Sequence, residues 1–446
     1  MSSSITNNFK QQLLKDFKAD VDSDGNTYYI ALARSESLVE PAIISSDAFA
    51  AKLRHRIQSV KITSNNSFVV PNVPWVGTTV YNAYDDNLPD QENFYVVNSS
   101  NEVFLCVEQG TDETGVGVGS LTEPSSALAN NSAKTFKTDD GYLWRYLYSI
   151  SNLGYSLYRT ADWVPVQQIT NPQTLIPEEA RQVLLQDSAV AGEIIGLAID
   201  SAGYNYTGPT ISLTSSTGGG ASFKAKVDDG RITAVYLDSN GEGLLSHGQG
   251  YDYNTTVTVS DPGTGAGASL RPIIGPKLGV SSDPVETLKC DALMMQTDFI
   301  NDEDNTIQAQ NQFYQVALMQ NIKGFNDSDF TANTGNALKR AELTGITGTW
   351  AENDTVRDVF SSKSARIFYV DGSTLYYVQD ETTGFTALSA GDELVTEQSG
   401  TATVVSLSDP DIDIYSGNIL YINNLDAEVT RESNQTEDIR IVVQLG

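Results

Sequence analysis

Apolar and polar residues alternate over short stretches along most of this chain, a pattern typical of half-buried β-strands. Helical spacing is confined mainly to the first sixty residues. One helix is predicted over 5–18, and a second runs from Ser46 or Asp47 to about Gln58. On the first helix, every fourth residue forms a single apolar stripe: Phe9, Leu13 and Phe17. The pattern therefore predicts a mainly β protein with a few N-terminal helices.

The clearest predicted strand follows the turn Asp140-Gly141. Successive side chains of a strand point to opposite faces of the sheet. Here one face carries Tyr142, Trp144, Tyr146 and Tyr148, and the other carries Leu143, Arg145 and Leu147. A strand with bulky residues on both faces has to be covered on both. We therefore expect this strand at the centre of a packed structure, with Trp144 buried.

An internal repeat occupies residues 193–275. Gly203-Tyr204-Asn205-Tyr206 recurs as Gly250-Tyr251-Asp252-Tyr253, at an offset of 47 residues (203 to 250). Each copy continues into an alternating strand, a glycine-rich turn and a further strand. Two copies are fewer than an open solenoid normally needs, so a compact all-β module is predicted. Short strands across 345–408, such as 365–370 and 374–378, indicate a second small β module.

These segments define the predicted domain organisation: a multi-domain, β-sandwich-like core interrupted by two inserted all-β modules. The first part of the core covers 1–176, and the module with the Gly-Tyr repeat covers 177–276. The core continues over 277–343, is interrupted by the second module over 344–409, and is completed by C-terminal strands over 410–446.

The chain is strongly acidic, with 27 basic and 57 acidic residues and a formal net charge of −30. A field of this sign repels nucleic acids and anionic membranes, so neither is expected as a partner. No stretch approaches the roughly 20 apolar residues of a spanning helix. The N-terminus lacks the pattern of a signal peptide, so we expect the protein to be used without secretion.

Metal-binding candidates are few. Asp20, Asp22 and Asp24 have the spacing that opens a calcium loop, and Gly25 supplies the turn. The acid expected at the twelfth position is replaced by Ala31 inside a strand, so a polar turn that ends the helix is the favoured interpretation, with calcium binding as the alternative. Two cysteines provide neither a disulfide framework nor a zinc site, and both are expected to be buried thiols.

Catalytic patterns are equally scarce, and no enzyme activity or cofactor is predicted. The chain has two histidines, His55 and His247, and no Gly-x-Ser-x-Gly elbow. Gly115-Val-Gly-Val-Gly119 lacks the third glycine of a dinucleotide fingerprint. Paired carboxylates of a glycosidase remain open in so acidic a chain. The Gly-Tyr clusters are interpreted as core residues, with stacking on sugars as the alternative.

Four motifs, in order along the chain, resemble the baseplate wedge subunits encoded by gene 8 of the T-even contractile-tailed bacteriophages. They are an N-terminal strand ending in Arg-Ser-Glu, the aromatic strand after Asp-Gly, a later strand with Phe-x-Gln, and a C-terminal Ser-Gly…Tyr…Asn and Gln-Thr-Glu pair. The matching positions are Arg34, Ser35, Glu36, Asp140, Gly141, Tyr142, Trp144, Tyr146, Leu147, Phe313, Gln315, Ser416, Gly417, Tyr421, Asn424, Gln435, Thr436, Glu437 and Ile439.

The resemblance covers roughly 1–175, 277–340 and 411–446, and leaves out both predicted modules. It departs at Tyr314, where the family has arginine, and at Asn423, where it has glutamate.

What the resemblance implies is a structural virion protein of the tail baseplate, assembled in the host cytoplasm, with no enzymatic activity. The implied partners are a second copy in a homodimer and other wedge proteins, with tail-fibre proteins as further candidates. Aromatic side chains, which large obligate interfaces use, agree with this expectation. The alternatives are a carbohydrate-binding or adhesin-type β protein that uses the 193–275 repeat, and an acidic hydrolase.

Overall fold

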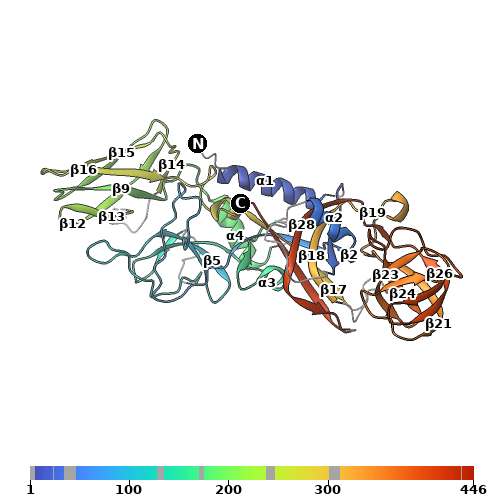
Figure 1. Cartoon of the computed structure of the whole chain (residues 1–446). Coiled ribbons are helices and arrows are strands. Elements are labelled where there is room, and N and C mark those ends of the chain that lie inside the picture. Colours follow the sequence, from blue (N-terminus) through green and yellow to red (C-terminus); the bar gives the residue numbers. More distant parts are fainter. Residues whose placement is uncertain are drawn as a thin grey trace. The chain divides into compact units, whose positions relative to one another are not determined.

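The structure is a computed structural model that describes residues 6–23, 25–34, 47–127, 135–169, 175–237, 247–300, 312–432 and 434–445. The predicted mainly β architecture with few helices is confirmed (Figure 1). The chain forms two compact units. Unit 1 contains residues 1–15, 67–293 and 444–446, and unit 2 contains residues 16–66 and 294–443. The residues predicted to form one core are thus divided between two units.

Unit 1 combines four helical segments with short β-sheets. Its helices are α1 (Asn7–Val21, whose last residues belong to unit 2), α3 (Asn152–Tyr158), α4 (Pro177–Asp187) and α5 (Pro284–Thr287). Its strands before the repeat are β3 (Asn65–Pro71, whose first two residues belong to unit 2), β4 (Tyr95–Val97), β5 (Glu102–Glu108), β6 (Thr135–Lys137), β7 (Leu143–Ser149) and β8 (Trp163–Pro165).

The aromatic strand β7 lies inside a four-stranded antiparallel sheet in the order β4-β5-β7-β6. Six of its seven residues are buried, so the prediction that both faces are covered is confirmed. One face packs into a cluster that contains Tyr142, Trp144 and Tyr146 together with Phe104 and Cys106. The hydrophobic burial of this cluster is the main stabilising term of the sheet.

The repeat forms paired strands whose partners come from different copies. The strands are β9 (Gly196–Tyr204), β10 (Thr210–Thr214), β11 (Gly219–Ala221), β12 (Phe223–Asp228), β13 (Arg231–Leu237), β14 (His247–Gln249), β15 (Thr256–Ser260) and β16 (Ala266–Ile273). Strand β9 of the first copy pairs with β16 of the second, and β14 of the second pairs with β11 of the first. The equivalent strands β10 and β15 pair with each other. Each copy therefore supplies strands that pair with strands of the other copy, an exchange of strands between the two.

The register of the repeat differs from the one predicted. Gly203 and Gly248 both have φ of +65°, and a Cβ on either would collide with a tyrosine ring and an alanine N–H. The tyrosines are Tyr206 and Tyr251, whose hydroxyls accept from Ala268 (3.2 Å) and Ala221 (3.1 Å). The structure thus equates Gly203 with Gly248, at an offset of 45 residues (203 to 248). The predicted match of Gly203 with Gly250 is wrong by two residues.

Unit 2 is organised around a five-stranded antiparallel sheet in the order β20-β2-β1-β18-β28. Its strands are β20 (Thr334–Asn336), β2 (Ile57–Ile62), β1 (Tyr28–Ala33), β18 (Gln312–Gln320) and β28 (Asn418–Thr430). Every residue of β1 is buried. Other elements of this unit are β17 (Ala292–Ile300, which begins in unit 1), β19 (Lys323–Gly324), η1 (Phe325–Asp327), β27 (Ile412–Asp413) and β29 (Thr436–Gln444).

The second predicted module is a closed six-stranded antiparallel barrel in unit 2, in the order β21-β24-β23-β22-β25-β26. Its strands are β21 (Lys339–Thr347), β22 (Thr355–Asp358), β23 (Ser364–Asp371), β24 (Thr374–Val378), β25 (Glu393–Thr396) and β26 (Thr401–Ser408). The barrel begins at Lys339, ahead of the predicted boundary at 344. Its interior is filled by apolar side chains such as Val356, Ile367 and Leu375, so it is a packed core without a lumen.

Both predicted N-terminal helices need correction. Helix α2 (Asp47–Arg54) ends before Ile57, because Ile57 pairs with Ala33 as the start of strand β2. Helix α1 spans Asn7–Val21 where 5–18 was predicted, and of its apolar stripe Phe9 is 53% and Leu13 42% exposed, while Phe17 packs edge-on against Tyr28. Its buried residues are Gln11 and Leu14, and Gln11 donates to the carbonyl oxygens of α5.

The exchanged pairing predicts equal roles for two tyrosines of the repeat. Removing the hydroxyl in Tyr206→Phe or Tyr251→Phe leaves one partly buried N–H without its acceptor, at a cost of about 1 kcal/mol. Hydrogen exchange with mass spectrometry should show faster exchange around Ala268 in the first variant and around Ala221 in the second. Tyr204→Phe is the control, because Tyr204 is 57% exposed. Unchanged exchange in both variants would contradict the assigned register.

Candidate functional site

The described residues contain no group of three or more histidine, cysteine, aspartate or glutamate side chains placed to hold a metal ion. Within the same ranges, no helix is both long and apolar enough to cross a membrane. Both cysteines are buried and unpaired as expected, and burial raises the pKa of Cys290 to about 12. A thiol with so high a pKa is a poor nucleophile at neutral pH.

The candidate calcium turn is occupied by internal contacts. The Asp20 carboxylate accepts hydrogen bonds from Asn26, Tyr28 and Gln320. The Asp22 carboxylate binds Lys18 at 2.8 Å and accepts from an asparagine amide at 2.7 Å. Asp24 lies outside the described residues. The described carboxylates of this turn therefore tie the end of α1 to neighbouring strands.

Arg34 connects the central sheet of unit 2 with the barrel. Its guanidinium is buried, donates to the carbonyl oxygen of Phe368 at 2.9 Å and pairs with Glu352 at 2.8 Å. It also lies 4.4 Å from the centre of the Phe368 ring, within the range of a cation–π contact. Burial lowers the pKa of Arg34, and Glu352 and Glu428 oppose that shift. The neighbouring Ser35 and Glu36 lie outside the described residues.

The Asp140-Gly141 turn is held by a carboxylate that accepts several hydrogen bonds. Asp140 accepts from the hydroxyls of Thr138 and Ser120 and from the N–H groups of residues 121 and 122. Burial acts to raise the pKa of this carboxyl, but these hydrogen bonds prevail and hold it below its ordinary value. Gly141 has φ of +90°, a conformation that favours glycine.

The aromatic side chains after this turn form one stacked group. Tyr142 and Trp144 stack with ring centres 5.4 Å apart and planes at 14°, and Tyr81 meets both rings edge-on. The Tyr142 hydroxyl donates to Val118 at 2.6 Å. Tyr146 is also buried and packs edge-on against Phe104. These residues are architectural, because their rings are almost inaccessible to any partner.

An ion pair that the sequence did not reveal lies on the other face of β7. Arg145 and Glu193 form two contacts, of 2.5 Å and 3.2 Å, with side chains only 1% and 3% exposed. The Arg145 guanidinium also donates to the carbonyl oxygen of Val280 at 3.3 Å. Removing one member of such a pair leaves a buried charge uncompensated. The pair therefore fixes the start of the repeat module against the aromatic sheet within unit 1.

The motif residues of the later strands meet in unit 2. Gln315 of β18 lies opposite Asn424 of β28, and its amide donates to the Asn424 side chain at 2.7 Å. Phe313 is buried on the same strand, whereas Tyr421 is 38% exposed. Arg54 at the end of α2 donates to the carbonyl oxygens of Ser416 and Gly417 at 2.6 Å and 2.7 Å.

The last motif lies at the start of β29, shortly after the end of β28. Glu437 is buried and accepts from Arg431 at 2.6 Å, with side chains 7% and 2% exposed. The Gln435 side chain accepts from the Glu432 N–H at 3.2 Å, and Thr436 is exposed. Glu437 thus acts as the counterion of a buried arginine.

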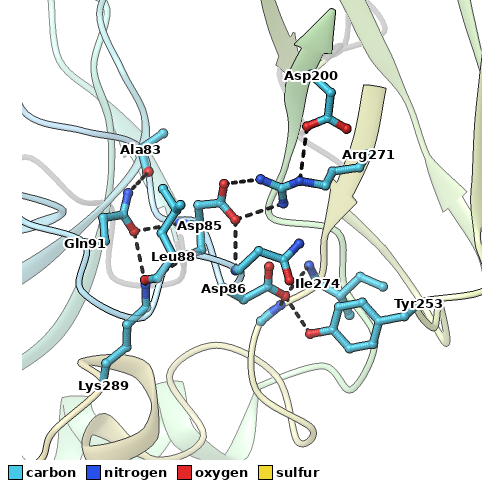
Figure 2. Close-up of polar contacts among 12 residues, drawn as sticks. Ala83, Asp85, Asp86, Leu88, Gln91, Asp200, Tyr253, Arg271, Ile274 and Lys289 are labelled. Carbon is cyan, nitrogen blue, oxygen red and sulfur yellow. Dashed lines mark hydrogen bonds and ion pairs between the residues drawn. The ribbon is translucent and has the colours of Figure 1, made fainter. Parts of the chain in front are cut away.

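A polar network in unit 1, which sequence reasoning missed, joins loop 83–91 to the repeat module (Figure 2). Arg271 of β16 pairs with Asp85 through two contacts of 2.9 Å and 2.5 Å, and reaches Asp200 at 3.4 Å. The adjacent Asp86 accepts from the Tyr253 hydroxyl at 2.6 Å. The acidic pair Asp85-Asp86 was visible in the sequence, but nothing there indicated its distant partners.

Lys289 completes this network from the other side (Figure 2). Its ammonium donates to the carbonyl oxygens of Asp85 and Leu88 at 2.7 Å and 2.6 Å, and to the Gln91 side chain at 3.2 Å. The rings of Tyr84 and Phe94 lie 5.0 Å and 4.7 Å from it. Burial lowers the pKa of Lys289 to about 8, although nearby carboxylates oppose the shift. The lysine anchors the loop that carries Asp85 and Asp86.

Comparison with models of known protein families finds no match, and comparison with curated protein sequences finds no significant match.

Burial of the aromatic group predicts a large effect of truncating Trp144. Trp144→Ala should lower the free energy of unfolding by about 3–5 kcal/mol, because it removes a fully buried ring and leaves a cavity. Urea denaturation followed by circular dichroism measures the change. Leu153→Ala is the matched control, since that apolar side chain is 67% exposed. An unchanged midpoint for Trp144→Ala would show that the ring is not packed as described.

The lowered pKa of Asp140 predicts a dependence on pH. The ionised carboxylate stabilises the folded state at neutral pH, and this contribution is lost as pH falls below about 3.8 and through the folded-state pKa. Asp140→Asn should therefore cost about 1 kcal/mol at pH 7 and progressively less below pH 4. Denaturation at several pH values tests this, with the exposed Asp139→Asn as control. A cost that stays constant down to pH 2 would contradict the assignment.

Proposed function

We propose that this chain is a structural virion protein, a subunit of the tail baseplate wedge of a contractile-tailed bacteriophage, which acts by assembling with other proteins. One observation carries the proposal. Three of the segments that resemble the wedge family, far apart in sequence, become neighbouring strands β1, β18 and β28 of one sheet. Segments of a shared core are expected to be adjacent in this way, whereas chance matches would have no reason to pair.

The matching residues support the same interpretation by what they do. The buried Arg34 forms an ion pair with Glu352, and Glu437 forms one with the buried Arg431. Asp140 stabilises a turn by accepting hydrogen bonds. Gly417 has φ of +64°, and a Cβ there would meet the Gln320 carbonyl oxygen at 2.6 Å. Each of these side chains or backbone positions maintains a strand end or a turn. This is the role expected of residues in a structural subunit, whose function is its shape and surface.

Features of the surface agree with assembly. Helix α1 exposes Phe9 and Leu13 one turn apart, and Phe360 on the barrel is 77% exposed. Adjacent exposed apolar side chains such as Phe9 and Leu13 are compatible with a protein–protein contact, whereas single exposed apolar residues are normal on any protein surface. The expected partners are a second copy of the chain and other wedge proteins, with tail-fibre proteins as further candidates. The net charge of −30 favours contacts with basic surfaces on those partners.

The proposal predicts where the protein is found. Immunogold electron microscopy of particles from a lysate of the source, with an antibody to this chain, should place gold at the tail tip. A parallel sample of particles that lack tails serves as control and should remain unlabelled. Gold on heads or fibres, or no labelled particles when the antigen is present in the lysate, would rule out the baseplate role.

The dimer can be tested separately with the purified chain. Sedimentation at micromolar concentration should give about twice the mass of 48.2 kDa of one chain. Phe9→Glu combined with Leu13→Glu tests whether the exposed face of α1 forms the contact, because both residues can change without disturbing a core. A mass close to that of one chain for the unmodified protein would contradict the dimer.

A further inference from the structure

A polar cavity of about 550 Å³ lies in unit 1 next to the Asp85–Asp86 network. Its walls come from the first turns of α1, from Tyr84 and Asp86, from residues 251–253 of the repeat module and from segment 274–289. Small-molecule sites typically measure about 300–1,000 Å³. The cavity therefore has the size of a binding site, and it is assembled from separate parts of one compact unit.

The charges around this cavity balance one another. The lining contains three lysines and three carboxylates: Lys15, Lys277, Lys289, Asp86, Asp252 and Glu286. Two of the lysines already have partners. Lys15 pairs with Asp283 and Glu286 at 2.8 Å, and Lys289 donates to carbonyl oxygens of loop 83–91. A site for an anion would present cations that are not neutralised in this way. The lining therefore favours a ligand without net charge.

Tyr253 lines the cavity, and its hydroxyl is bonded to Asp86 (Figure 2). Its hydroxyl donates to Asp86 at 2.6 Å, and the same carboxylate oxygen accepts from the N–H groups of Ile274 at 3.3 Å and Gly275 at 3.1 Å. The side chain is nevertheless 64% exposed. A ring held by its polar tip, with most of its surface uncovered, is already positioned for stacking and loses little conformational freedom on binding.

The remaining polar groups suit a ligand rich in hydroxyls. Four amide side chains of α1 line the cavity: Asn7, Asn8, Gln11 and Gln12. Gln11 already donates to the carbonyl oxygens of α5, so the other three are the candidates for contact with a ligand. Amides both donate and accept hydrogen bonds, and carboxylates accept two or more. A pyranose ring offers hydroxyls that do both, together with a face of C–H groups that packs on an aromatic ring. This combination of amides, carboxylates and a fixed tyrosine matches the two surfaces of a sugar.

We propose that this cavity binds a neutral saccharide, with one sugar ring stacked on Tyr253 and its hydroxyls bonded to Asp252 and to the amides of Asn7, Asn8 and Gln12. The proposal stands apart from the baseplate role, because it concerns a soluble ligand and a site within one unit. It also distinguishes among the tyrosines of the repeat. Tyr206 and Tyr251 are buried and serve as hydrogen-bond acceptors of the module core, which leaves Tyr253 as the platform.

The test uses the full-length chain on an array of neutral and acidic glycans, followed by saturation-transfer NMR with the methyl glycosides of glucose, galactose and mannose. Three variants are compared with the unmodified protein. Tyr253→Ala removes the platform, Tyr253→Phe keeps the ring but releases it from Asp86, and Tyr204→Ala is the matched control. Tyr204 is 57% exposed on the same module but does not line the cavity.

We expect binding to at least one neutral glycan, weakened roughly tenfold or more by Tyr253→Ala. Tyr253→Phe should weaken it less, and Tyr204→Ala should leave it unchanged. Circular dichroism confirms that each variant is folded. The proposal is overturned if no neutral glycan binds, if only acidic glycans bind, or if Tyr253→Ala binds as well as the unmodified chain. None of these outcomes bears on immunogold labelling of the tail tip, so the two proposals fail independently.

Discussion

Unit 2 depends on the position of one strand, β18, between β1 and β28. These strands come from the beginning, the later half and the end of the chain, and their register pairs Tyr28 with Gln320 and Leu318 with Tyr421. Bringing such distant segments together costs chain entropy, because long loops have to close before the contacts of the sheet form. The complete burial of β1 supplies the compensating hydrophobic free energy. Arg34 and Arg54 then attach the barrel and the β28 turn to this sheet.

Local features of this fold could be predicted from the sequence, because they depend on neighbouring residues. Alternation identified β7, and the bulk of its side chains on both faces correctly implied that it is covered on both. The same reasoning found β1, β18 and several strands of both modules. On α1 the spacing located the helix and its apolar stripe, but it did not reveal that Phe9 and Leu13 of that stripe face solvent. The buried face of this helix contains Gln11, whose amide donates to the carbonyl oxygens of α5. The spacing of apolar residues carries no information about that partner.

Contacts between distant segments could not be predicted. Arg145 and its partner Glu193 are separated by 48 residues along the chain, and Asp85 and its partner Arg271 by 186 residues. A single sequence gives each of these residues many possible partners of opposite charge. The cavity beside Tyr253 has the same origin, since α1, loop 83–91 and the segment after β16 meet only when unit 1 has folded. The repeat was recognised correctly, but its register was not. In the sequence Gly203-Tyr204 matches Gly250-Tyr251, whereas in the structure the equivalent of Gly203 is Gly248, which no tyrosine follows.

The exchange of strands between the two copies has a consequence for how such a module could arise. A single copy contains β9 without β16, or β14 without β11, and so cannot satisfy its own backbone hydrogen bonds. An ancestral chain with one copy would have needed a second, identical molecule to complete it. Duplication in tandem turns that bimolecular encounter into a permanent intramolecular one and frees each copy to diverge. The turns after β10 and β15 illustrate such divergence: the N–H of Gly218 donates to the Ser215 hydroxyl, whereas the N–H of the equivalent Gly263 donates to the Asp261 carboxylate.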